Sequence, residues 1–187
     1  KFGSDAIAGS AAALTFEAYC YYIVTSFCAA TIAFTGQNFG AGKADRCRRV
    51  VRICMLYSFV LCLLANVLIV WQEAACISVF TSDPAVAAFA SQRFHTVLLF
   101  QALACSYEVP GSYMRGLGYS VTPMLLTIFG TCVLRLGWVY CFTAIDNSFH
   151  TLLLIYPISW AATGVAVSAA ALVVQRHVFR NMPAPAA

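Results

Sequence analysis

Three charged side chains of this sequence lie inside long apolar stretches. They are Glu17, Glu108 and Arg135, and runs of Leu, Val, Ala and aromatic residues surround each of them. An ionisable group in the interior of a bilayer costs about 3 kcal/mol or more, so such groups face a polar cavity, a pathway or one another. A carboxylate in that position can bind a small cation or a cationic molecule, and an arginine can neutralise the carboxylate.

Glu17 begins a polar stripe that helical spacing places near one face. Tyr21 stands four residues after Glu17, and Thr25 four residues after Tyr21. We expect this stripe to serve the passage of an ion or a substrate. Arg135 falls within about one helical turn of Glu17 in depth, at about 1.5 Å per residue, which allows an ion pair or a shared cavity.

Purely structural roles are the alternative for the other two charges. Glu108 lies near the end of its apolar stretch and closer in depth to Arg115, so an interfacial Glu108–Arg115 pair is one interpretation. For Arg135 the alternative is a structural ion pair, or a side chain that extends to the membrane interface.

The composition indicates that lipid surrounds these groups. The chain has 187 residues, of which 61% are hydrophobic and 10% charged, whereas soluble domains are about 25% charged. The apolar stretches lack the alternation of membrane strands, so the sequence predicts an all-α transmembrane fold, with residues 1–182 as one domain. The predicted membrane helices are 6–36, 51–72, 85–109, 121–144 and 147–175, and residues 183–187 form a flexible tail.

Residues that start or stop helices mark the breaks between these spans. Ser82 or Asp83 can cap the third span, because their side-chain oxygens accept hydrogen bonds from free backbone N–H groups. Pro110 is expected to close that span, since proline lacks the N–H of a continuing helix. Asn147 or Ser148 can cap the fifth span.

The glycine-rich segment FTGQNFGAGKADRCRRVVR (34–52) could be taken for a phosphate-binding loop. A P-loop needs four residues between its first Gly and the Gly-Lys, followed by Ser or Thr. Here five residues separate Gly36 from Gly42, and Ala44 takes the place of the hydroxyl. We expect instead a tight turn between two membrane helices, followed by a basic helix start. The residues assigned to this turn motif are Gln37, Asn38, Gly40, Gly42, Lys43 and Arg46.

The distribution of basic residues predicts the orientation. Eight lie in or beside the 37–50 loop, the 110–120 loop and the tail, against one, Lys1, at the opposite ends of the spans. The positive-inside rule therefore places the first group and the C-terminus in the cytoplasm, where we expect contact with anionic membrane lipid and none with nucleic acid. The nine cysteines include no CxxC pair, so we expect no metal site.

Six blocks of the sequence resemble one transporter family. In chain order they are FGSDAIAG, FTGQNFGAGKADRCRR, VFTSDPAV, MRGLGYSVTPML, VLRLGWVY and YPISW. Their order and spacing are similar to the second half of multidrug and toxic compound extrusion (MATE) transporters, especially the bacterial members. The chain has no starting methionine, so we expect it to be a fragment.

The resemblance implies a twelve-helix antiporter built from two six-helix lobes in the bacterial inner membrane. The chain would supply five helices of the second lobe, and the N-terminal lobe would be its partner. Such a transporter exports amphipathic or cationic drugs and toxins by alternating access, driven by sodium or protons without a cofactor. The family pattern carries an acid near Glu17, a Glu at Glu108 and a base at Arg135, whereas Ala104 stands where one branch has an Asp.

Other functions fit the composition as well. A related branch of the superfamily would act as a flippase for lipid-linked precursors, and a membrane scaffold would transport nothing. An enzyme is not expected, because the sequence has no HExxH motif or paired intramembrane aspartates.

Overall fold

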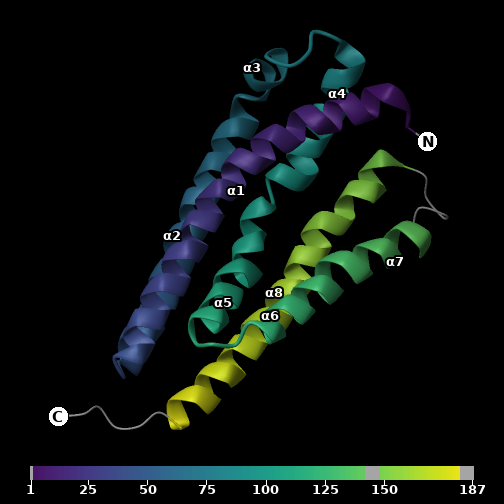
Figure 1. The fold of residues 1–187 in the computed structure, drawn as a ribbon. Helices are drawn as coiled ribbons and strands as arrows, with labels where there is room; N and C mark the ends of the chain where they lie inside the picture. The colour runs from purple at the N-terminus through teal and green to yellow at the C-terminus, as the bar shows by residue number, and fades with distance from the viewer. Residues whose placement is uncertain (1, 142–147, 182–187) are drawn as a thin grey trace.

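The computed structural model describes residues 2–141 and 148–181, and every regular element in these ranges is a helix (Figure 1). Four segments are long and apolar enough to cross a membrane: α1 (Gly3–Gly40), α2 (Ala44–Trp71), residues 121–141, and α8 (Phe149–Arg180). The predicted all-α membrane fold is confirmed. The predicted tail at 183–187 lies outside the described residues.

α1 and α2 form a long antiparallel hairpin (Figure 1). The turn was expected over residues 37–42, but α1 continues through Gly40 and the chain reverses within three residues. Of the described residues in this turn, Gly42 alone has a positive φ, of 70°, a conformation that glycine adopts without steric cost. The N–H of Lys43 then donates to the carbonyl of Asn38 at 2.9 Å, which closes the turn. α2 begins at Ala44 rather than 51, so the basic residues form its first turns.

The third predicted span is a broken helix. It consists of α4 (Pro84–Arg93), the π-helical η1 (Phe94–Leu98), the 3-10 helix η2 (Gln101–Ala104) and α5 (Cys105–Gly116). Asp83 caps it as expected, since its Oδ1 accepts from the N–H of Ala85 at 2.8 Å. π and 3-10 segments within a longer helix often mark functional positions.

The prediction that Pro110 ends this span was wrong, because α5 continues through it. A proline in a helix leaves the carbonyl four residues earlier without its usual N–H donor. That carbonyl belongs to Ser106, and it accepts the hydroxyl of Ser168 from α8 at 2.9 Å. A neighbouring helix therefore supplies the missing donor, as in other membrane helices that contain proline.

The last two spans pack against each other. The segment 121–141 comprises α6 (Val121–Thr127), the π-helical η3 (Ile128–Val133) and α7 (Leu134–Cys141). Its predicted end at 144 and the candidate cap Asn147 lie outside the described residues. Ser148 caps α8, where its Oγ accepts from the N–H of Thr151 at 3.1 Å. The short α3 (Glu73–Ser78), which follows α2, was not expected.

α5 is the central element, between the α1–α2 hairpin and α8 (Figure 1). Small residues let these backbones approach closely. A Cβ on Gly116 would collide with Thr35 of α1, and one on Gly164 of α8 would collide with Ser106 of α5. Without a hydrophobic force between helices in lipid, close packing at small residues is a main source of association.

Candidate functional site

A buried ion pair links α1 to α4. The guanidinium of Arg93 donates to both carboxylate oxygens of Glu17, with Nε–Oε1 at 2.6 Å and NH2–Oε2 at 2.9 Å. The two side chains are only 6% and 9% exposed. Of the two arrangements that depth allowed for Glu17 and Arg135, the ion pair is not formed among the described residues, because Glu17 pairs with Arg93. Arg93 is the tenth residue of α4, and it was not among the charged residues that the sequence singled out.

Arg135 lies on the aromatic face of α8 instead. Its Nε donates to the hydroxyl of Ser159 at 3.0 Å, and its Cζ is 4.5 Å from the ring centroid of Tyr156 and 5.9 Å from that of Trp160. The Cζ of Arg93 lies 5.1 Å from the same Tyr156 ring. Tyr156 thus joins the two arginines through cation–π contacts. The sequence prediction missed it, although the YPISW block contains it.

Glu108 bonds across to α1. The hydroxyl of Tyr21 donates to Glu108 Oε1 at 2.5 Å, while Arg115 NH1 donates to Ser112 Oγ at 3.3 Å. The alternative Glu108–Arg115 pair is therefore not formed among the described residues. Glu17 and Tyr21 belong to one face of α1, as expected, but they contact different partners.

Thr25 takes part in neither the Glu17–Arg93 pair nor the Tyr21–Glu108 contact. It is exposed, and its hydroxyl donates to the backbone carbonyl of Tyr22 at 3.1 Å. Eight residues turn an α-helix by about 80° beyond two full turns, whereas seven residues leave a rotation of only about 20°. The buried face of α1 therefore continues from Glu17 through Val24 and Cys28.

Gln101 adds a polar group beside the ion pair. Its Nε2 donates to the backbone carbonyl of Glu17 at 2.8 Å, and its Oε1 is buried without a hydrogen-bond partner in the described part of the chain. Such an orphaned oxygen in a native structure is often satisfied by a water molecule or an ion. This acceptor comes from η2, the irregular part of the broken span, and no sequence pattern indicated it.

The turn motif forms a second, separate feature. About 20 residues of α1 separate Glu17 from Gln37 and Asn38, a distance of about 30 Å along the helix. The carbonyls of Gln37 and Asn38 accept bonds that close the turn, and that of Lys43 accepts from the N–H of Arg46 at 3.1 Å. These contacts give the motif a structural role in reversing the chain.

The arrangement has two carboxylates with different partners. Glu17 is neutralised by Arg93, whereas the hydrogen-bond donor to Glu108 is a neutral hydroxyl. A carboxylate held by a neutral donor at membrane depth is the better ligand for a cation, because no cation of the protein has to be displaced. Among the described residues, no group of three or more His, Cys, Asp or Glu side chains could hold a metal ion.

Comparisons with known proteins agree with this architecture. Over 126 residues the chain is 28% identical to "Probable multidrug resistance protein NorM" of Aromatoleum aromaticum, an alignment that covers 67% of this chain and 27% of that protein. Among solved structures, "MATE transporter ClbM in complex with Rb+" superposes with a TM-score of 0.65 at 18% identity, over 95% of this chain and 40% of that one. The chain thus spans less than half the length of either relative.

The family model described as MatE matches residues 1–141. The match includes α1, the broken span and the whole of the segment 121–141, so it contains Glu17, Glu108 and Arg135. The resemblance expected from the six sequence blocks is confirmed. The chain is an integral membrane protein segment that belongs to the MatE family.

Proposed function

We propose that the complete protein that contains this chain is a cation-coupled antiporter that exports amphipathic or cationic compounds by alternating access. Family membership and the likeness to a protein named for multidrug resistance support this function. The observation that carries it is the Tyr21–Glu108 contact between α1 and α5, in which the hydrogen-bond donor to the carboxylate is an uncharged hydroxyl. An anionic carboxylate at that depth is stabilised by a proton, a sodium ion or a cationic substrate.

Competition for Glu108 would couple the two fluxes. One carboxylate holds either the coupling cation, sodium or proton, or the cationic compound. Binding of the coupling cation from one side therefore releases the compound there. Glu17 lies one helical turn before Tyr21 and pairs with Arg93, and Tyr156 contacts both Arg93 and Arg135. We take these three charged side chains as a charged wall beside Glu108, and the ion pair of Glu17 holds α1 against α4. The Oε1 of Gln101, which has no hydrogen-bond partner among the described residues, would be a further oxygen ligand beside this wall.

The remaining parts of the proposal concern location. The five spans supply most of the second lobe, and the N-terminal lobe of the same transporter completes the cavity. The protein lies in the bacterial inner membrane. The basic residues of the α1–α2 turn and of the end of α8 are in the cytoplasm with the C-terminus, as the positive-inside rule predicts.

Export by the complete transporter in proteoliposomes tests the function. A fluorescent cationic dye is loaded, and a sodium or proton gradient is imposed. Glu108→Gln removes the charge and should abolish gradient-driven export, whereas Glu108→Asp should keep part of it. Glu73→Gln is the matched control, because Glu73 bonds to Ser91 and His95 outside the cluster.

Three outcomes would contradict the proposal. Export by Glu108→Gln at the wild-type rate would exclude Glu108 as the coupling ligand. Movement of a lipid-linked precursor, with no dye export, would identify a flippase. The absence of transport with either cargo and either gradient would indicate a scaffold.

A further inference from the structure

An apolar groove lies between α2, α5 and α8, toward the α1–α2 turn. The cavity has a volume of about 480 Å³. Its walls consist chiefly of aliphatic and aromatic side chains, among them Val51, Met55, Leu56, Phe59, Ala171 and Leu172. Leu56 and Leu172 are more than half exposed, so the groove is accessible from the surface of this chain.

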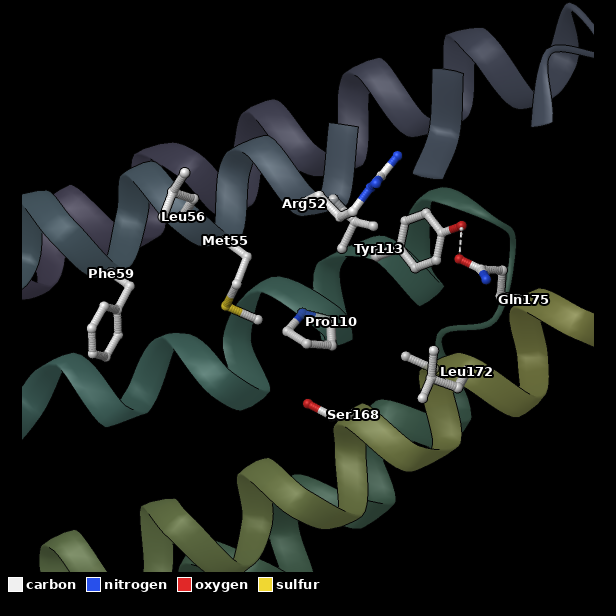
Figure 2. A pocket seen from close by; sticks show the side chains of 11 residues that line it. Arg52, Met55, Leu56, Phe59, Pro110, Tyr113, Ser168, Leu172 and Gln175 are labelled. Atoms are coloured by element: carbon white, nitrogen blue, oxygen red, sulfur yellow. Dashed lines mark hydrogen bonds between the residues drawn. The ribbon is translucent and has the colours of Figure 1, made fainter. Parts of the chain in front are cut away.

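One end of the groove is polar. Figure 2 shows Arg52, Tyr113 and Gln175 at this end and Phe59 at the other. The hydroxyl of Tyr113 donates to Gln175 Oε1 at 2.9 Å, so the acceptor of this amide is used and its N–H groups are donors for another molecule. Arg52 donates from Nε to the carbonyl of Arg48 at 3.3 Å, which holds its side chain along the helix. The polar end therefore offers donors and a positive charge.

This polar end belongs to a basic end of the molecule. Residues 43–52 contain five basic residues and one acidic residue, Asp45. The last turns of α8 add Arg176 and Arg180, and the Cζ of Arg48 lies 5.0 Å from the ring centroid of Phe179, so the two basic segments are adjacent. A molecule with a negative group is complementary to this charge.

The dimensions match a lipid better than a small anion. From Arg52 to Phe59 the wall of the groove extends along α2 for about 10 Å, at about 1.5 Å per residue. A positive group is thus followed by an apolar channel that runs toward the middle of the membrane. A free phosphate would contact only the positive group, whereas a phospholipid contacts both the positive group and the apolar channel.

We propose that this groove binds one anionic phospholipid from the leaflet on the side of the α1–α2 turn. Its phosphate accepts from Arg52 and Gln175, and an acyl chain lies along Met55, Phe59 and Leu172. Basic pockets between membrane helices bind lipid headgroups in this way. The proposal goes beyond the transport function and does not depend on it, because it requires only that the chain lies in a membrane.

Lipid retention by the purified complete transporter, measured by native mass spectrometry in detergent, tests this site. Wild-type protein should retain dioleoyl phosphatidylglycerol in preference to dioleoyl phosphatidylcholine. Loss of a charge-assisted hydrogen bond in Arg52→Gln should weaken phosphatidylglycerol binding about tenfold or more. Arg49→Gln removes the same charge from an exposed position outside the groove, and it should weaken binding less than about threefold. Thermal unfolding of both variants verifies that they are folded.

Other results would overturn the proposal. Equal weakening by the two substitutions would indicate diffuse attraction to the basic end only. Equal retention of the two lipids, or an Arg52→Gln variant that binds like wild type, would mean that another part of the transporter covers the groove or that the headgroup is not recognised. Competition by glycerol 3-phosphate at the affinity of the lipid would indicate a soluble-phosphate site. This experiment measures lipid retention without any ion gradient, so a negative result would not bear on the transport proposal.

Discussion

Removal of one partner of the Glu17–Arg93 pair should destabilise the protein strongly. Both side chains are less than one-tenth exposed, and the contact is bidentate, so solvent screening is small. Loss of one partner of such a pair costs about 3–5 kcal/mol, because the other charge is left buried. We expect this cost for Arg93→Gln and for Glu17→Gln. The double variant should cost less than the sum by at least about 2 kcal/mol, since it leaves no unpaired charge.

The assay is a double-mutant cycle on the unfolding free energy of the purified complete transporter. The chain provides a matched control in Asp45 and Arg48, which form an ion pair at 2.9 Å with side chains 94% and 46% exposed. An exposed pair of this kind contributes about 0–1 kcal/mol, so its coupling should be small. Equal coupling energies for the two pairs, or additive effects of the Glu17 and Arg93 substitutions, would refute the assignment of a buried ion pair.

Three further changes test individual contacts by thermal unfolding of the same protein. Tyr21→Phe should cost about 1.5–3 kcal/mol, because Glu108 loses a hydroxyl donor at 2.5 Å; an unchanged stability would mean that the contact is absent in the membrane. Ser148→Ala should cost about 1 kcal/mol through loss of the cap of α8, and no loss would refute the cap. Gly164→Ala should cost about 1–3 kcal/mol because its Cβ would collide with α5, whereas Gly137→Ala, which faces open space, should cost nothing.

The spans were predictable because their signals are local. Length and apolar composition define α1, α2 and α8, and Asp83 and Ser148 cap helices through side chains that reach only two or three residues along the chain. By contrast, the continuation of α5 through Pro110 was not predictable from local sequence. It depends on the hydroxyl of Ser168, 62 residues from the carbonyl that it satisfies, and no local pattern specifies that donor.

For the candidate site, the sequence singled out Glu17, Glu108 and Arg135 but did not predict which residues they contact. Their apolar surroundings predicted that Glu17 and Glu108 face other helices, and both contact another helix, with Glu17 buried and Glu108 partly buried. The choice between Arg93 and Arg135 as partner of Glu17 depends on how α4 crosses α1, where Gly9 admits the backbone of α4 at residues 86 and 90. The position of a residue along a helix axis determines only its depth. Which neighbour its side chain meets also depends on the rotation of each helix and on the breaks at η1 and η2.

In the proposed coupling mechanism, the charges of Glu17, Glu108, Arg93 and Arg135 determine how one proton or sodium ion acts on a cationic compound. With both carboxylates ionised, Glu17 and Glu108 contribute −2 and Arg93 and Arg135 contribute +2, so the sum is zero. Binding of one cation at Glu108 makes the sum +1. Because Tyr156 holds both arginines against the same ring, neither positive charge can leave the cluster without breaking a contact with α8. The added cation is therefore expected to repel a cationic compound from this wall, which is the competition that an antiporter requires.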